Sequence, residues 1–442
     1  MRNILLVNPW IYDFAAYDLW LKPWGLLKIS AVLKEKGLRL FMVDTTDRHH
    51  PGLDERPRDH MDGTGKFREE EIEKPGILEK IPRKYKRYGL SVEAFLGALP
   101  EEDIDLILLS SGMTYWYPGV FEAVRLLRME YPGVAIALGG TYATLEYEHA
   151  RLNSGADIVI SNSELDKLSE LLGGGYDLSF QNLLDKTIDY DWYPRSAYAV
   201  LRLSLGCPFD CAYCAQKRLG PSFMLKEEQA AISEFSALYE RGIRNFAFYD
   251  DALLFAGDYL VQYLERITSS GLDARFYTPN GLHARFMSQR KADLMKKAGF
   301  VNPTLSLEIA DPDKARSWHN KVTVEELRKA IGSLRKAGYR KGRYTVYLML
   351  GMPGTSISDV KRSVDLVHSL GAKVSLSEYS PVPGSTKTPC FTADEKDPLY
   401  QNNSIFPTFC ASEWGQVKKI KEYTRQLNTK LLSGKNTHDI PA

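Results

Sequence analysis

Three of the chain's five cysteines lie within eight residues, in the segment CPFDCAYC from Cys207 to Cys214. Gaps of three and then two residues place these thiols on one short loop. Thiolates are ligands of zinc and of iron–sulfur clusters, and both usually take four protein ligands. Three thiols would leave one iron of a cluster with an open position, where a substrate or cofactor can bind. The alternative is three ordinary buried cysteines, which this spacing at the end of a predicted strand disfavours.

Zinc sites of this type usually pair two CxxC units, and the sequence contains no second unit. The remaining thiols, Cys390 and Cys410, lie twenty residues apart without histidines at ligand spacing. Two thiols are too few for a second cluster, so we expect both to be small buried apolar residues.

Length and composition indicate a folded protein of two or three domains, because the chain has 442 residues, 44% hydrophobic and 26% charged. A net charge of +1 gives no indication of a nucleic-acid partner. The first apolar run is too short for a signal peptide, and no stretch approaches the ~18 apolar residues of a transmembrane helix. We therefore expect a cytoplasmic protein, in which clustered cysteines bind a metal more often than they form disulfides.

The first 175 residues alternate between short apolar runs and amphipathic segments. Continuous apolar strands separated by helices predict a parallel sheet covered on both faces, which binds ligands beyond the carboxyl ends of its strands. Strands are expected over 3–8, 38–44, 103–111, 134–140 and 156–162, and helices over 23–37, 119–131 and 164–172.

A charged insertion over residues 47–89 interrupts this pattern. We expect it to be a solvated excursion. The alternative is a flap over the cleft between domains, whose basic end, residues 80–89, would meet an anionic substrate or a redox protein.

Residues 176–198 are expected to form a linker, after which a second strand–helix alternation covers 199–390. Its six βα units are fewer than the eight of a complete barrel and predict a partial one. Residues 391–442 are expected to be a small helical extension. The predicted barrel strands are 199–206, 244–251, 274–281, 303–310, 343–351 and 373–384.

The cysteine segment resembles the signature of the radical SAM enzymes, CxxxCxxC with an aromatic residue before the last cysteine. Cys207, Cys211, Tyr213 and Cys214 match that signature in spacing and type. The resemblance implies a 4Fe-4S cluster on the three cysteines, whose open iron binds the amino and carboxylate groups of S-adenosyl-L-methionine (SAM). It also implies reductive cleavage of SAM to a 5′-deoxyadenosyl radical, with the electron supplied by a flavodoxin or ferredoxin.

Three further segments follow in the order that this family shows, and they imply more SAM contacts besides Tyr213. FYDDALLF contains Asp250 and Asp251, one of which would meet the amino end of SAM or the substrate. SLEIA contains Glu308, a SAM contact, and the glycines of LGMPGTS, Gly351 and Gly354, would let the backbone approach the adenosine. The alternatives are a helix cap for Asp250, a barrel arginine paired with Glu308, and plain turns at the glycines.

The front unit resembles the cobalamin (B12)-binding domain that precedes the barrel in one class of radical SAM enzymes. The resemblance rests on NILLVNP, PWGLLKISAVLKEKG, LILLSSGMT, IALGGTYAT and GADIVIS. It implies a corrin in a groove of loops, with its nucleotide tail between a strand and a helix. The cobalamin contacts that it implies are Ser110, Thr114, Tyr115, Gly139, Gly140 and Thr141.

Many cobalamin modules carry Asp-x-His-x-x-Gly after the first strand, and no histidine occurs in that loop here. The string does occur in DRHHPG, residues 47–52, after the second predicted strand. We favour a chance match over a lower axial ligand from His49 or His50. Without a histidine, a loop such as residues 113–118 would cover that face of the cobalt.

The resemblance implies a cobalamin-dependent methyltransferase that acts on an unactivated carbon through the 5′-deoxyadenosyl radical and methylcobalamin. One alternative is a radical SAM enzyme of this architecture that catalyses a cyclisation, rearrangement or C–C coupling, with or without cobalamin. Another is a cluster-bearing binding or electron-transfer protein with no turnover.

The sequence does not identify the substrate, and peptide, lipid, porphyrinoid and small-metabolite substrates stay open. Residues 278–286 and 378–389 are expected to line the mouth of the barrel. The side chains that we expect there, and that are the candidates for catalysis, are Tyr277, Asn280, Arg285, Glu378 and Tyr379.

Overall fold

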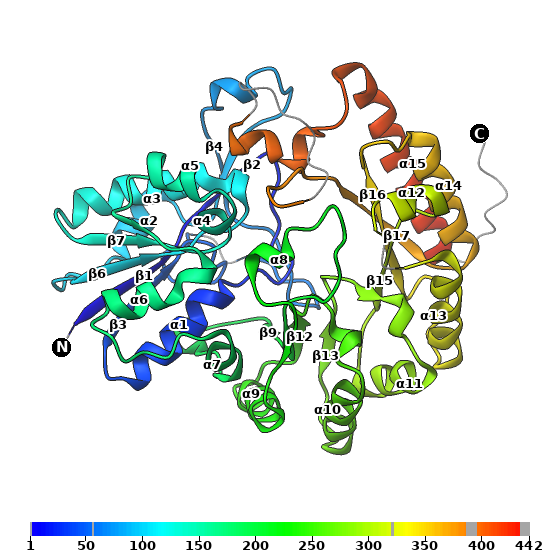
Figure 1. The fold of residues 1–442 in the computed structure, drawn as a ribbon, viewed down its shortest axis with the longest axis horizontal. Helices are drawn as coiled ribbons and strands as arrows, with labels where there is room; N and C mark the ends of the chain where they lie inside the picture. The colour runs from blue at the N-terminus through cyan, green and yellow to red at the C-terminus, as the bar shows by residue number, and fades with distance from the viewer. Residues whose placement is uncertain (1, 55–56, 320–321, 386–395, 434–442) are drawn as a thin grey trace.

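The computed structural model describes residues 2–54, 57–319, 322–385 and 396–433. It contains two α/β units, a front unit built on one parallel sheet and a larger unit whose strands curve as a partial barrel (Figure 1). The predicted fold class, a Rossmann-like sheet followed by a partial (β/α)6 barrel, is confirmed.

The front sheet has the order β3-β1-β6-β7-β8, and all of its strand pairs are parallel. Alternate residues of β1 explain why it is buried on both faces, between β3 and β6. Leu5 and Val7 pack on one side with α3, whereas Ile4 and Leu6 pack on the other with α1 and α6. The elements are β1 Asn3–Asn8, α1 Trp24–Glu35, β3 Arg39–Asp44, α2 Val92–Gly97, β6 Leu106–Leu109, α3 Tyr117–Glu130, β7 Ala135–Leu138, α4 Thr141–Leu145, α5 Tyr147–Asn153, β8 Ile158–Val159 and α6 Leu165–Leu171.

The charged insertion is more ordered than a solvated excursion. Its strand β5 (Lys86–Tyr88) pairs antiparallel with β2 (Ile11–Asp13) on one edge and with β4 (Glu69–Glu71) on the other. The guanidinium of Arg48 is buried, and its Nε donates to Asp18 Oδ2 at 2.7 Å. The expectation of a solvated excursion is therefore wrong for this part of the insertion, because its charges are paired and its aromatic residues join the core.

The second unit contains the six predicted barrel strands and one further short strand, β14, divided between the sheets β13-β12-β9 and β14-β15-β16-β17. Phenylalanines of β12 and β13 pack with the surrounding helices in one apolar core. The strands are β9 Ala199–Leu201, β12 Asn245–Phe248, β13 Arg275–Tyr277, β14 Leu282–His283, β15 Thr304–Glu308, β16 Thr345–Leu350 and β17 Lys373–Glu378. The helices are α9 Glu228–Glu240, α10 Asp258–Ser269, α11 Gln289–Ala298, α12 Pro312–Ser317, α13 Val324–Lys336 and α14 Ile357–Ser369.

The segment between the units is packed rather than exposed. It contains α7 (Phe180–Asp185), and the side chains of Tyr190, Tyr193 and Tyr198 are buried. The Tyr190 hydroxyl accepts a hydrogen bond from the backbone N–H of Val200 in β9 at 2.8 Å. The predicted linker thus forms part of the contact between the front unit and the barrel.

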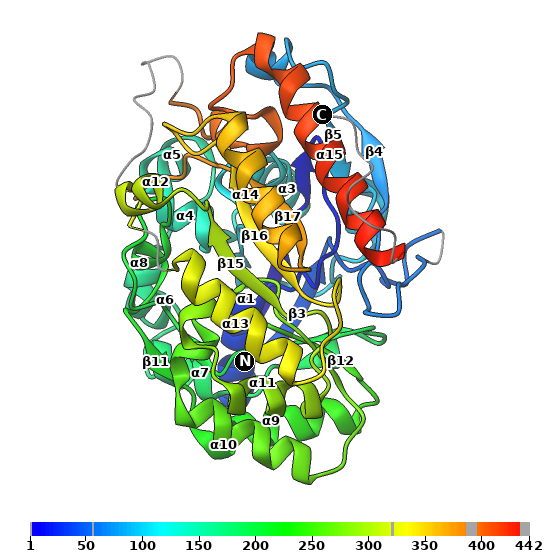
Figure 2. The same ribbon diagram turned by 90° about the vertical axis from the view of Figure 1, so that its right-hand side faces the viewer.

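The C-terminal part returns to the front unit before its last helix. We call residues 397–409 the strap. Leu399 and Ile405 of the strap pack in the core of the front unit, and the strap residue Asn402 donates to the buried Asp13 at 3.0 Å. Helix α15 (Trp414–Ser433) then lies along α14 on the barrel (Figure 2).

Three buried charges join the two units. Glu234 of α9 accepts from Lys28 of α1 at 2.8 Å and from Lys226 at 3.1 Å, and none of these side chains is more than 2% exposed. Burial alone would raise the pKa of Glu234, but the adjacent ammonium groups lower it overall. Lys28 also donates to the backbone carbonyls of Leu184 and Lys186, so the remaining donors are satisfied.

Replacing Glu234 should destabilise the whole chain, because two ammonium groups would stay buried without their counterion. We expect Glu234→Gln to lower the free energy of unfolding in urea by about 3–5 kcal/mol. The control is Glu422→Gln, which removes an exposed partner of Arg425 within α15 and should have little effect. Equal effects of the two substitutions would contradict a structural role for the buried group.

In the described part of the chain, no helix combines the length and the apolar character that crossing a bilayer requires.

Candidate active site

The three-cysteine loop follows the first barrel strand and is closed at its base. Strands β10 (Ser204–Leu205) and β11 (Met224–Leu225) pair antiparallel on either side of it. Gly206 has φ +83°, and a Cβ there would lie 2.0 Å from the carbonyl oxygen of Pro221. Only glycine fits at this close contact. Gly206 therefore allows the chain to pass from the end of β10 straight into the cysteine loop.

The cysteines share this loop but differ in exposure. Cys211 is buried, Cys207 is half-buried and Cys214 is exposed. The N–H of Gln216 points at the Cys214 sulfur at 3.5 Å, at the start of the short helix α8 (Gln216–Leu219). In Figure 1, α8 lies between the front unit and the barrel.

Outside the loop, the expectation of a buried apolar residue is wrong for Cys410. This cysteine is exposed and contacts the polar side chains of Ser412 and Glu413. Cys390 lies outside the described residues.

The donor set fits an iron–sulfur cluster better than a single ion. Among the residues that the structure describes, no three His, Cys, Asp or Glu side chains are arranged to hold one metal ion. Three thiols on one loop are the donors of a cluster that keeps one iron open, and cluster ligands need not converge on one point. The loop is fixed elsewhere, because Ala212 N–H donates to the Trp318 carbonyl at 3.1 Å.

Two of the predicted SAM residues lie together beside the cysteines. Burial raises the pKa of Tyr213 well above its ordinary value, and the adjacent Glu308 and Cys211 raise it further. Glu308 has φ +68°, and the pairing of β15 with β16 shifts register between Ser306 and Glu308. A non-glycine residue in this region is strained, which is common at ligand sites.

Asp250 is a positioning residue for the loop. Its carboxylate is 2% exposed, accepts from the N–H of Leu203 at 3.0 Å, and accepts from the N–H and hydroxyl of Ser204 at 2.6 Å each. Burial raises the pKa of Asp250 to about 6. The alternative role of Asp250 as a cap of the following helix is wrong, because its hydrogen bonds go back to Leu203 and Ser204, before the cysteines.

Asp251 faces a different group. Its Oδ2 accepts from Gln216 Nε2 at 3.0 Å and lies 3.9 Å from the guanidinium of Arg202. Asp251 is therefore linked to the residue two positions after Cys214, whereas Asp250 is occupied by backbone groups.

The two predicted adenosine glycines have different surroundings. A Cβ at Gly351, which has φ +88°, would lie 2.7 Å from Thr408 Oγ1 and 2.8 Å from the ring of Phe409, both in the strap. Thr408 also donates to the Gly351 carbonyl at 2.7 Å. The close approach at Gly351 is thus to the strap, whereas Gly354 has open space at its Cβ position.

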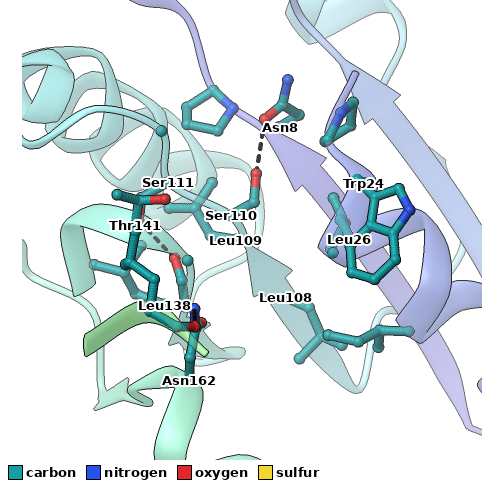
Figure 3. A pocket seen from close by; sticks show the side chains of 18 of the residues that line it. Asn8, Trp24, Leu26, Leu108, Leu109, Ser110, Ser111, Leu138, Thr141 and Asn162 are labelled. Atoms are coloured by element: carbon teal, nitrogen blue, oxygen red, sulfur yellow. Dashed lines mark hydrogen bonds between the residues drawn. The ribbon is translucent and has the colours of Figure 1, made fainter. Parts of the chain in front are cut away.

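A cavity of about 450 Å³ extends from the carboxyl edge of the front sheet to the cysteine loop. This volume is within the range of cofactor pockets. Its walls include the ends of β1, β6 and β7 and the start of α1 (Figure 3). Gln216 and Leu219 of α8 also line it. Ser110 and Ser111 lie on one side and Trp24 on the other, and the Ser110 hydroxyl donates to Asn8 Oδ1 at 2.7 Å.

Four of the six predicted cobalamin contacts line this cavity: Ser110, Gly139, Gly140 and Thr141. The other two are buried next to it. Thr114 donates to Gln401 of the strap, and burial raises the pKa of Tyr115 above its ordinary value. The sequence did not indicate that the Thr114 hydroxyl would form a hydrogen bond with the strap.

Neither candidate histidine lines the cavity. His49 Nε2 lies 3.1 Å from Asp59 Oδ1, and His50 Nδ1 accepts from the N–H of Gly52 at 3.1 Å. Burial lowers the pKa of His49, which favours the neutral ring. These contacts are local to the insertion and agree with a chance match of the string.

The predicted barrel-mouth side chains are mostly engaged by the chain itself. Tyr277 stacks on Trp20 with ring centroids 4.8 Å apart, and Asn280 Nδ2 donates to the Tyr249 carbonyl at 2.8 Å. Arg285 is paired with Glu326 at the start of α13.

The last two candidates lie where β17 ends. Glu378 pairs with Lys421 of α15, and Tyr379 is buried against the indole of Trp318. Lys22, Trp24, Arg202 and Gln216 line the cavity instead, although the sequence analysis did not select them. The available signal was their position: Lys22 precedes α1 and Trp24 begins it, Arg202 follows β9, and Gln216 follows the last cysteine of the loop.

Residues 201–367 match the family model of the radical SAM superfamily. This part of the chain is a radical SAM domain. This match confirms the family expected from the cysteine spacing and, with it, the 4Fe-4S cluster and SAM as its cofactors.

Two curated relatives of this radical SAM chain are distant. The anaerobic magnesium-protoporphyrin IX monomethyl ester cyclase of Cereibacter sphaeroides is 26% identical over 31% of this chain and 23% of the relative. An uncharacterised methyltransferase of Pyrococcus horikoshii is 23% identical over 55% of this chain and 53% of the relative. The matches thus span about half or less of these relatives.

Two solved structures share the order of a front sheet and a radical SAM barrel. The methyltransferase TsrM from Kitasatospora setae, with cobalamin and a 4Fe-4S cluster bound, has a TM-score of 0.63 at 15% identity. That match covers 87% of this chain and 76% of TsrM. The cobalamin-dependent enzyme OxsB has a TM-score of 0.54 at 10% identity, over 96% of this chain and 56% of OxsB. These likenesses confirm the B12-domain fold of the front unit.

Removing the Asp250 carboxylate should loosen the cysteine loop. Asp250→Ala leaves three buried donors of residues 203 and 204 without an acceptor, so we expect a loss of about 3 kcal/mol or more in the free energy of unfolding. After anaerobic reconstitution, the iron retained per chain should fall several-fold.

The matched control for Asp250→Ala is Ser204→Ala, which removes one of those donors and keeps the carboxylate. It should cost about 1 kcal/mol and retain iron. Full iron retention by Asp250→Ala would show that the loop does not depend on this carboxylate.

Proposed function

We propose that the chain is a cobalamin-dependent radical SAM enzyme that transfers a methyl group to an unactivated carbon. The observation that carries the proposal is the cavity between the units. Gly139, Gly140 and Thr141 of the front unit line one part of it, and Gln216, two residues after Cys214, lines another. A corrinoid in this cavity would lie next to a cluster on the cysteine loop.

The cavity fits a corrinoid at its walls. Gly139 has open space at its Cβ position, with only the Ile160 carbonyl within 4 Å, at 3.7 Å. Gly140 has φ +96° and packs on the backbone of Ser111, so the β7–α4 turn presents backbone to the cavity. The apolar side chains of Leu108, Leu168 and Leu183 line its inner end, which suits a nucleotide tail.

When bound, the cluster would supply an electron for SAM cleavage and the corrinoid would carry the methyl group. Cys207, Cys211 and Cys214 would hold the cluster, and Tyr213, Glu308 and Gly354 would form the surroundings of SAM. Asp250 fixes the loop from behind, and Thr408 of the strap is held against Gly351 beside this site. A flavodoxin or ferredoxin would supply the electron.

A non-methylating reaction is the second candidate. One relative is named as a porphyrin ester cyclase, and another is named as a methyltransferase. The products separate the two, because only methyl transfer from SAM gives S-adenosylhomocysteine. A protein without turnover would give neither this product nor 5′-deoxyadenosine.

The first test is reconstitution with iron, sulfide and hydroxocobalamin, followed by desalting and a visible spectrum. We expect about one corrinoid per chain beside the cluster absorption, and 5′-deoxyadenosine after reduction with SAM. Cys207→Ala, Cys211→Ala and Cys214→Ala should each abolish the cluster, whereas the control Cys410→Ala should retain it. A cluster spectrum without a corrinoid would refute the cobalamin part of the proposal.

A side chain at Gly139 should compete with the corrinoid. Gly139→Leu can be accommodated by the fold but projects into the cavity, so we expect the affinity for hydroxocobalamin to fall at least about tenfold. The cluster and the secondary structure should be unchanged. The control Gly332→Leu places the same side chain in open space on α13 and should leave corrinoid binding unaltered.

A further inference from the structure

We propose that the cavity contains an oxyanion subsite, formed by Lys22, Arg202 and the N-terminus of α1, that binds a carboxylate or phosphate group of the ligand. The inference deepens the proposed function, on which it rests only for the identity of the molecule that carries the oxyanion.

The charge of the cavity wall is the first observation. Lys22 and Arg202 line the cavity, and no aspartate or glutamate is among the residues that line it. Three other polar side chains there are occupied. Asn8 donates to Asp44 at 2.7 Å, Ser111 donates to the Gly139 carbonyl at 2.6 Å, and Asn162 donates to the Leu219 carbonyl at 2.8 Å.

Lys22 is the second observation. The residue is only 8% exposed, and its ammonium lies 3.8 Å from the centroid of the Tyr193 ring. The nearby acids are Asp47, whose pKa the charge of Lys22 lowers against the effect of burial, and Asp44, which accepts from the Tyr193 hydroxyl at 2.7 Å. Among the described residues, neither acid forms an ion pair with Lys22 in direct contact. A bound oxyanion would supply that direct contact for the buried ammonium.

Arg202 comes from the barrel side. Its guanidinium lies over the ring of Trp24 at 4.9 Å, and its Nε is buried without an acceptor among the described residues. The nearest carboxylate, that of Asp251, is 3.9 Å away and already accepts from Gln216. Arg202 therefore has N–H donors available for a ligand, and the Trp24 ring fixes the position of its guanidinium.

The first turn of α1 supplies the third component. This helix has 12 residues, Pro23 precedes it without a side-chain cap, and its first turn contains no acid. Its first N–H groups lack acceptors inside the helix, and its dipole favours an anion at this end. Gly25, which also lines the cavity, has open space at its Cβ position, so a ligand atom can approach the backbone there.

Two molecules could carry the oxyanion. One is the corrinoid, whose nucleotide tail contains a phosphodiester. The other is the substrate, which would then be a carboxylate or a phosphate ester bound between the corrinoid and the cluster. Both would be recognised by the same two cations and the same helix end.

The probe is radiolabelled orthophosphate, measured by equilibrium dialysis against the full chain with its cluster and without a corrinoid. The wild type should bind one phosphate per chain. Gly25→Asp puts a negative charge in the subsite and should weaken phosphate binding at least about tenfold. Gly25→Asn has the same shape without the charge and should stay within about twofold.

Lys22→Met and Arg202→Gln should each weaken phosphate binding about tenfold or more. If Lys22→Met or Arg202→Gln prevents folding, the comparison of Gly25→Asp with Gly25→Asn still tests the subsite, because a side chain at Gly25 has open space. Absence of saturable phosphate binding by the wild type, or equal binding by the Gly25→Asp and Gly25→Asn variants, would overturn the proposal.

Competition identifies the source of the oxyanion. Displacement of phosphate by cobalamin, but not by cobinamide, which lacks the nucleotide phosphate, assigns the subsite to the corrinoid. Phosphate binding that persists beside bound cobalamin assigns it to the substrate. Displacement by both corrinoids would put the corrin ring over the site and overturn the proposal. Failure of any corrinoid to bind would refute the proposed cofactor, and the phosphate measurement would still stand.

Discussion

The site depends on the buried contact between Asp250 and the backbone of residues 203 and 204. That carboxylate binds three donors where the chain leaves the first barrel strand, and so directs the cysteine loop toward the front unit. Burial disfavours the charged carboxylate and raises the pKa of Asp250 to about 6. The hydrogen bonds from residues 203 and 204 offset part of this cost, because they stabilise the charged form. A residue that resembles a ligand of SAM acts here as support for the loop that would bind the cluster.

The two units form one structure because charged and apolar contacts between them are buried together. Glu234 of the barrel is enclosed by Lys28 and Lys226, and the strap returns from the barrel to pack Leu399 in the front unit. Such contacts fix the distance between the front sheet and the cysteine loop. The cavity is a consequence of that fixed distance, since its walls come from both units.

Charge is distributed unevenly around the cavity. Aspartates behind the wall are occupied by hydroxyl and amide donors, whereas Lys22 and Arg202 face the cavity without full partners. Native proteins seldom bury a cation without a hydrogen-bonded anion unless a ligand supplies that anion. The left-handed Glu308 is a further departure from local preference, and it lies by Tyr213 of the cysteine loop.

The sequence by itself determined the family, the cysteine loop and the order of strands, because these depend on short spacings and on apolar runs that any neighbours would bury. Cys207–Cys214 and the strands from 3–8 to 373–384 could therefore be predicted. Only the tertiary structure decided the roles of Asp250, Thr114 and Gly351, whose partners lie up to 287 positions away. The tertiary structure also decided the role of Lys22 and Arg202, because nothing in their local sequence indicates a site and only the packing of the two units brings them to one cavity.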